Sequence, residues 1–149
     1  MKLQKISVFG DVMLDEYCDG NVTRISPEAP IPIFDFVHSQ KMLGGAANVA
    51  KNIAGYGAEC HLYGLIGDDT QGRDIKNLIK SNGIVDKCKK LENFQTIQKT
   101  RIVSGSNQIL RIDKEDSHKE FSEKIKDKIS KYNDLVLNDL LDSEVVVLS

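Results

Sequence analysis

The sequence predicts an α/β fold, a parallel sheet flanked by helices, because strand-like and helix-like segments alternate along much of the chain. Two β-rich stretches, at about 19–40 and 96–113, interrupt this alternation and predict excursions from the core sheet. A chain of 149 residues has the size of one domain, and about two-thirds of the unfolded surface is buried at this length. One hydrophobic core is therefore expected.

The first strand is expected at residues 6–9, a short apolar run that ends in a turn at Gly10 and Asp11. In parallel sheets, ligands gather at the carboxyl ends of the strands. Three prolines then exclude a helix between residues 21 and 40, and the apolar residues among them favour an edge strand or ribbon.

Helix and strand alternate in the next part of the chain. A helix over 44–57 is predicted because small and apolar side chains recur at helical spacing, namely Ala46, Val49, Ala50, Ile53 and Ala54. Residues 60–66 alternate as a second strand, and a second helix over 69–82 ends before Gly83. This order predicts that the strands of the sheet are parallel.

The second β-rich stretch predicts a hairpin, with strands at 97–104 and 108–112 around Gly105-Ser106-Asn107. Ser117 and Glu120 form a capping-box pattern ahead of a third helix, whose apolar stripe is Phe121, Ile125, Ile129 and Tyr132.

Residues 145–148 predict a further buried strand that ends at Ser149. In a parallel sheet, a site residue or a turn into a helix normally follows the carboxyl end of a strand. We therefore expect the sheet of this chain to be incomplete.

The charge and the cysteines exclude several classes of function. A formal net charge of −2, evenly scattered, gives no basic face for nucleic acid or an anionic membrane, and the N-terminal apolar run is too short to span one. A small soluble ligand is expected instead. Three widely spaced cysteines and three histidines without ligand spacing predict neither a disulfide framework nor a metal site, and they fit a reducing cytoplasm.

Gly44 and Gly45 precede the first long helix, where free backbone N–H groups and the helix dipole can bind a hydroxyl or an anion. Asn48, in the first turn, faces away from the apolar side of that helix and could bond to sugar hydroxyls. The alternatives are a tight turn into a closely packed helix for the glycines, and an exposed polar residue for Asn48.

Asp11 and Asp15 follow the first strand, where carboxylates can accept paired hydrogen bonds from the vicinal hydroxyls of a polyol. Lys99 and Arg101 alternate onto one face of the predicted hairpin, which also carries Arg111, and these cations suit a phosphate. The alternatives are turn or capping roles for the aspartates, and a sheet edge protected by charge. No GxSxG, GxxxxGK[ST], GxGxxG or HExxH pattern supports a hydrolase, P-loop, dinucleotide-binding or metalloprotease function.

Three runs resemble the ribokinase (PfkB) family of carbohydrate kinases, GDVMLD at 10–15, RISPEAPIP at 24–32 and GGAANVA at 44–50. GGAAN is shared widely in that family. RISPEAPIP, together with Lys99-Thr100-Arg101 and NQILRID at 107–113, is closest to the D-glycero-D-manno-heptose 7-phosphate kinases of ADP-heptose synthesis. The resemblance covers essentially the whole chain and identifies it as the N-terminal part of one ribokinase-like domain.

This resemblance implies a ribokinase-like sheet with a small β lid that often forms the clasp of a homodimer. Such enzymes use ATP and Mg²⁺ to phosphorylate the anomeric hydroxyl of the sugar phosphate, here in lipopolysaccharide core synthesis. The positions that match the acceptor-sugar site are Asp15, Gly44, Gly45 and Asn48. The positions that match lid residues facing the substrate, with the cations on its 7-phosphate, are Lys99, Arg101, Arg111 and Asp113.

The sequence departs from the heptose kinases in two places. Ser106 stands where they usually carry a basic residue. The Gly-Ala-Gly-Asp motif, whose glycines form an anion hole and whose aspartate is the catalytic base, does not occur in the 149 residues. We therefore expect the base and the nucleotide site beyond Ser149, and we expect this chain alone to be inactive. The alternatives are a kinase for another sugar phosphate or a nucleoside, and a non-catalytic sugar-binding or dimerisation module.

Overall fold

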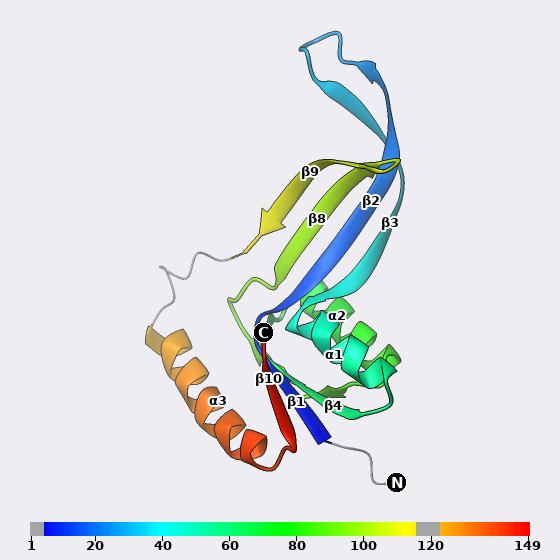
Figure 1. The fold of residues 1–149 in the computed structure, drawn as a ribbon. Helices are drawn as coiled ribbons and strands as arrows, with labels where there is room; N and C mark the ends of the chain where they lie inside the picture. The colour runs from blue at the N-terminus through cyan, green and yellow to red at the C-terminus, as the bar shows by residue number, and fades with distance from the viewer. Residues whose placement is uncertain (1–4, 116–122) are drawn as a thin grey trace.

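The computed structural model describes residues 5–115 and 123–149, and it shows a layered α/β body from which a second β-sheet projects (Figure 1). The core sheet is parallel, with the strand order β10-β1-β4-β6. Its strands are β1 (Lys5–Phe9), β4 (Glu59–Tyr63), β6 (Val85–Asp86) and β10 (Val145–Leu148). The helices are α1 (Ala46–Gly55), α2 (Thr70–Ser81) and α3 (Glu123–Leu141). This arrangement confirms the predicted fold class.

Alternate side chains of the central strands face different helices. Val8 and Leu62 are fully buried on one face, in a cluster with residues of α1 and α2. Phe9 and Tyr63 lie on the other face, in a cluster with Tyr132 of α3. A parallel sheet that is covered on both faces needs apolar side chains on both, which explains why apolar residues follow one another at the ends of β1 and β4, Val8 with Phe9 and Leu62 with Tyr63.

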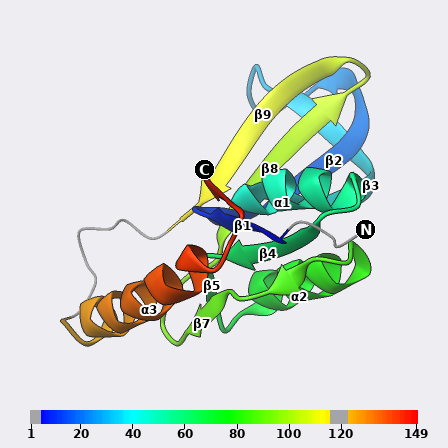
Figure 2. The same cartoon turned by 60° about the horizontal axis from the view of Figure 1, so that its bottom comes forward.

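The second sheet, which we call the lid sheet, has the strand order β3-β2-β8-β9. Its strands are β2 (Val12–Ile25), β3 (Pro32–Gly45), β8 (Ile97–Ser104) and β9 (Asn107–Lys114). β2–β3 and β8–β9 are antiparallel hairpins, and β2 runs parallel to β8. The two predicted excursions therefore lie side by side in one sheet, which leans away from the core in both views (Figures 1 and 2).

The first excursion is longer than predicted. It was expected from about residue 19, but β2 begins at Val12, directly after the turn that follows β1. Met13 pairs with Gly44 of β3 and with Ile97 of β8, so this part of β2 already belongs to the lid sheet. The pairing partners are distant in sequence, which is why local patterns did not show it.

The single strand predicted over 60–66 is divided at Gly64. Residues after it form β5 (Leu65–Gly67), which pairs with β7 (Lys89–Leu91) in a separate two-stranded sheet. A Cβ at Gly64 would lie 2.5 Å from the Val12 side chain. The backbone N–H of Gly64 donates a hydrogen bond to the Tyr132 hydroxyl at 3.0 Å. The chain passes too close to its neighbours here for a side chain.

The helices begin close to the predicted positions. α2 is capped by Asp69, whose Oδ1 accepts a hydrogen bond from the Gly72 N–H at 2.7 Å. The predicted capping box of α3, Ser117 and Glu120, and Phe121 of its stripe lie outside the described residues. None of the helices that the structure describes is long and apolar enough to cross a membrane.

Candidate functional site

The charged residues predicted from the sequence share one face of the lid sheet. The register pairs Lys99 of β8 with Asp15 of β2 on one side and with Asp113 of β9 on the other. It also pairs Arg101 with Arg111. Residues in register point to the same side of a sheet, and so do residues two apart in one strand. All five side chains therefore lie on the same face.

Asp15 and Arg101 form the tightest contact of this face. The Arg101 Nη1 donates to the Asp15 Oδ1 at 2.5 Å, and both side chains are about four-fifths buried, with exposed fractions of 19% and 21%. This hydrogen bond raises the pKa of Arg101. The guanidinium also lies over the Tyr17 ring, 5.2 Å from its centroid. Arg101 thus holds Asp15 as an oriented acceptor at the base of the lid sheet.

Gly44 and Gly45 connect the lid sheet to α1, and each is required for a different reason. The Asp15 Oδ2 lies against Gly44, where a Cβ would come within 2.5 Å of it. Gly45 has φ 56° and precedes α1, and a Cβ on it would overlap the carbonyl oxygen of Asp11. No side chain caps the start of α1, so the N–H groups that follow Ala46 in its first turn have no side-chain acceptor among the described residues.

The remaining predicted residues differ in their contacts. Asn48 is exposed in the first turn of α1, and its side chain makes no hydrogen bond to the part of the chain that the structure describes. Lys99 is partly exposed, without an ion pair to any described residue. The Arg111 Nε donates to the Asp113 Oδ1 at 2.9 Å on the outer strand. The structure thus joins Asp15, Gly44 and Arg101 directly and places the others around them, while their roles as ligand groups stay predictions.

A cavity of about 240 Å³ lies at the carboxyl ends of β1 and β4. Its lining residues are mostly apolar and include Phe9, Leu65 and Tyr132, and the polar Asp11 also lines it. The Asp11 carbonyl accepts the first N–H of α1, from Ala46, at 2.9 Å. The cavity is therefore next to the start of α1, at the end of the sheet where ligands of α/β proteins bind.

Two features of the site were missed in the sequence. Tyr17 lies two residues after Asp15 on the same face, and strand alternation could have found it. Asp69 was recognised only as the start of a helix, but its carboxylate also accepts hydrogen bonds from the Thr96 N–H and Oγ1 at 2.8 and 2.7 Å. It therefore ties α2 to the residue before β8. Among the described residues, no three His, Cys, Asp or Glu side chains are grouped so that they could hold a metal ion.

Comparison with known proteins identifies the class. Residues 3–146 match the family described as "pfkB family carbohydrate kinase". The chain therefore belongs to the pfkB family of carbohydrate kinases, as the sequence motifs indicated.

The chain is similar to particular members of this family, and each match covers most of this chain and a minor part of the relative. The bifunctional protein HldE of Actinobacillus pleuropneumoniae serotype 5b (strain L20) is 43% identical over 140 residues, which cover 91% of this chain and 30% of that protein. HldE of Koribacter versatilis (strain Ellin345) is 48% identical over 112 residues, 75% of this chain and 23% of that protein. The chain thus spans less than a third of the length of these relatives.

Solved structures agree on the fold. Phosphofructokinase-2 from Escherichia coli, in complex with fructose-6-phosphate, superposes with a TM-score of 0.70 at 17% identity, over 99% of this chain and 45% of that one. A ribokinase-type structure from Agrobacterium tumefaciens gives a TM-score of 0.68 at 14% identity, over 99% and 44%. Identities this low establish a shared ribokinase-like fold and nothing about the substrate.

Proposed function

We propose that this chain is the acceptor-binding part of a kinase that transfers the γ-phosphate of ATP to the anomeric hydroxyl of D-glycero-D-manno-heptose 7-phosphate, in ADP-heptose and lipopolysaccharide core synthesis. The observation that carries the proposal is the charged face of the lid sheet, where Lys99 lies in register between Asp15 and Asp113. This face offers acceptors for sugar hydroxyls and cations for a phosphate. The identity to HldE proteins supports the heptose as the sugar.

The contacts assign different tasks to the charged residues. The Asp15 Oδ1 is taken by Arg101, so Arg101 orients Asp15, and the carboxylate presents its remaining lone pairs to vicinal hydroxyls. Lys99 has no ionic partner among the described residues and is the cation most available for the 7-phosphate, with Arg111 beside it. Asn48 and the uncapped start of α1 complete the hydroxyl contacts.

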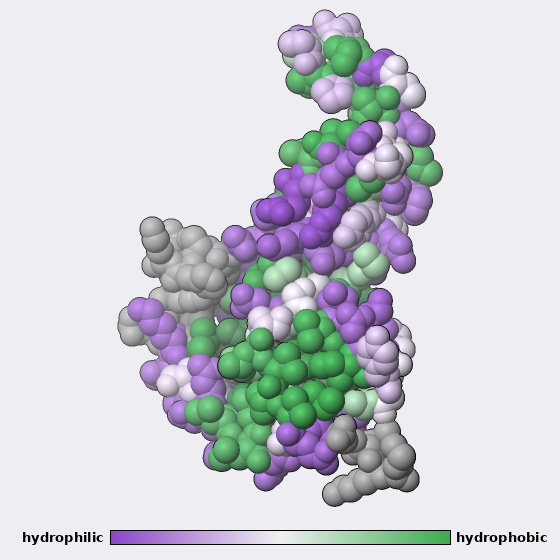
Figure 3. All heavy atoms as spheres, in the orientation of Figure 1, coloured by the Kyte–Doolittle hydropathy of each residue, from purple (hydrophilic) through white to green (hydrophobic). Residues whose placement is uncertain are grey.

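We place the nucleotide site, its Mg²⁺ and the catalytic base outside residues 1–149. The Gly-Ala-Gly-Asp motif, to which the family resemblance assigns the catalytic base, does not occur in them. β10 is the outer strand of the described core sheet, and Val145, Val146 and Leu148 are 46%, 41% and 75% exposed. Figure 3 shows an apolar area on the body, where Figure 1 places β10. An exposed apolar outer strand fits further strands packed beside it. The chain alone is then expected to bind the acceptor and not to transfer phosphate.

The lid sheet is also proposed to form a homodimer. At its far end, Ile25, Phe36 and Val37 are 62%, 61% and 62% exposed, and a second copy packed there would cover these apolar side chains. All three cysteines are free thiols, and we place the protein in a reducing cytoplasm.

Thermal unfolding with separate ligands tests the proposal. A ligand that binds only the folded state, present at a concentration 100 times its Kd, stabilises that state by about 2.7 kcal/mol. Heptose 7-phosphate should therefore raise the Tm, and adenosine, which probes for an adenine pocket without phosphates, should not. Asp15→Asn and Asn48→Ala should remove the sugar-phosphate shift, whereas Asn77→Ala, at an exposed position on α2, should retain it. A shift that survives in both site variants, or a shift with fructose 6-phosphate or a nucleoside in place of the heptose, would contradict the assignment.

A further inference from the structure

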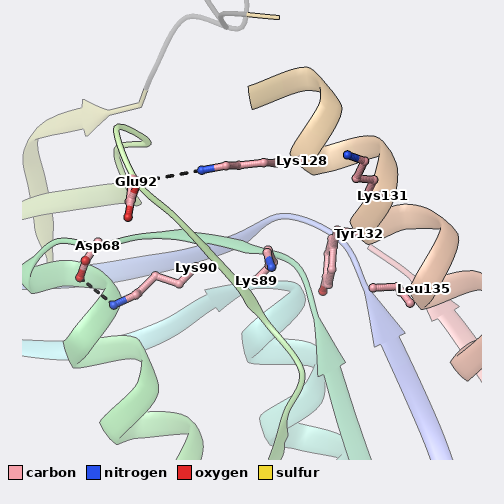
Figure 4. Close-up of a pocket in the computed structure, with 8 residues that line it drawn as sticks. All are labelled: Asp68, Lys89, Lys90, Glu92, Lys128, Lys131, Tyr132 and Leu135. Carbon is pink, nitrogen blue, oxygen red and sulfur yellow. Dashed lines mark hydrogen bonds and ion pairs between the residues drawn. The ribbon is translucent and has the colours of Figure 1, made fainter. Parts of the chain in front are cut away.

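A second cleft lies on the body, between α3 and the segment around β7 (Figure 4). Its volume is about 330 Å³, which is within the range of small-molecule sites. None of its lining residues belongs to the lid sheet or to the start of α1. The lining residues are Asp68, Lys89, Lys90, Glu92, Lys128, Lys131, Tyr132 and Leu135.

The cleft is strongly cationic for a chain whose net charge is −2. Four of its lining residues are lysines, against two carboxylates, and the lysines come from both walls, β7 on one side and α3 on the other. Like charges that converge in one cleft repel each other, and a bound polyanion would relieve that repulsion.

Only part of this positive charge is neutralised within the protein. The Lys90 Nζ pairs with the Asp68 Oδ1 at 3.0 Å. The Lys128 Nζ lies 4.0 Å from the Glu92 Oε2, and the exposed fractions of these side chains are 54% and 78%, so the pair is weak and easily exchanged. Lys89 and Lys131 have no ion pair with any residue that the structure describes, and Figure 4 shows them on opposite sides of the cleft.

The floor of the cleft is rigid and partly apolar. Tyr132 is 8% exposed, and its hydroxyl is already fixed, since it donates to the Lys87 carbonyl at 2.9 Å and accepts from the Gly64 N–H at 3.0 Å. Leu135 is 69% exposed beside it. A ligand with a charged end for the lysines and an organic part for this floor would use both features.

We infer that this cleft binds a small molecule carrying a di- or triphosphate group, at a site separate from the proposed acceptor site. Lysine ammonium groups act as compact point charges toward phosphate. Lys89 and Lys131 hold the phosphates from opposite walls, and Lys128 joins them when it leaves Glu92.

Calorimetric titration of the whole chain with inorganic triphosphate, at low ionic strength, tests the inference. Lys89→Gln together with Lys131→Gln should weaken binding by at least about tenfold, because two charge-assisted contacts are lost. Lys51→Gln together with Lys80→Gln, on α1 and α2, changes the net charge equally and should alter the affinity by less than about twofold. Neither control lysine has an ion pair among the described residues.

A third variant tests the same arrangement through an increase in triphosphate affinity. Glu92→Gln removes the competing carboxylate at a well-exposed position and should tighten triphosphate binding. Absence of saturable binding, or an equal loss in both double lysine variants, would overturn the inference. Titration with ATP in the absence of Mg²⁺ distinguishes two sources of the phosphate group. If ATP binds more tightly than triphosphate, and the Lys89→Gln/Lys131→Gln variant loses this binding, the ligand is a nucleotide. If ATP and triphosphate bind equally, the ligand is a polyphosphate.

Discussion

The core sheet and the lid sheet use their faces in opposite ways. In the core sheet, Val8 and Leu62 are fully buried, and helices cover both faces of the central strands β1 and β4. In the lid sheet, one face carries the charged site, and the other exposes Leu110 and Ile112, at 55% and 43%. Figure 3 shows the hydrophilic middle of the lid above the apolar body. The core should therefore determine the free energy of unfolding, and the lid should determine ligand binding.

Leu62→Ala should have the largest effect on stability. It leaves a cavity between β4 and the α1 and α2 layer, and such changes lower the free energy of unfolding by about 2–5 kcal/mol. The matched change in the lid, Leu110→Ala, should alter it by less than about 0.5 kcal/mol. Urea denaturation measures both. Equal effects would show that the lid sheet contributes to the core.

Asp69→Asn tests the link between the two regions. Burial tends to raise the pKa of Asp69, but hydrogen bonds from Thr96 and Gly72 outweigh it and lower the pKa below its ordinary value of 3.8. A group whose pKa is lower in the folded state stabilises the protein fully above its unfolded pKa and loses that contribution as the pH falls through the folded pKa. At pH 7, the free energy of unfolding of the wild type should exceed that of Asp69→Asn by about 1 kcal/mol, as is typical for the loss of a helix cap.

That difference should shrink below pH 3.8, and urea midpoints at pH 7 and pH 3 measure it. A difference that stays constant between these pH values would mean that the hydrogen bonds of Asp69, rather than its charge, account for the stabilisation.

The same contrast explains what the sequence could predict. β1, α1 and α2 follow from local patterns, because their apolar spacing reports a face that is buried against the core. The β7 strand is three residues long, too short for any periodicity. Strand alternation placed Lys99 and Arg101 on one face, but the ion pair of Arg101 with Asp15 spans 86 positions and depends on the parallel pairing of β2 with β8. Such pairings are set by tertiary structure.

Lys99→Gln should affect binding and leave the fold unchanged. Lys99 is partly exposed without an ion pair among the described residues, so its loss should alter the unfolding free energy by less than about 0.5 kcal/mol. Heptose 7-phosphate affinity should fall about tenfold, because one charge-assisted contact to the phosphate is removed. Lys80→Gln, on α2, is the control in the same titration. If the two variants bind equally well, the phosphate does not lie at Lys99.

The smallest expected effect is a difference in thiol reactivity between the two regions. Burial raises the pKa of Cys60, in the core, to about 11, so roughly one molecule in a thousand carries the thiolate at pH 8. Burial also raises the pKa of Cys88. Cys18, in the lid sheet, has a pKa raised by partial burial and by Glu16 and Asp19. Cys18 and Cys88 are both half-buried, but the Cys88 thiol donates to the Leu62 carbonyl at 3.7 Å, whereas the Cys18 thiol has no such bond among the described residues. Ellman's reagent should therefore modify Cys18 first, and the other two thiols only as the core unfolds. Cys18→Ser should abolish the fast phase of the reaction with Ellman's reagent. A fast phase that persists in this variant would show that the core opens as readily as the lid, which would contradict the difference between the two sheets.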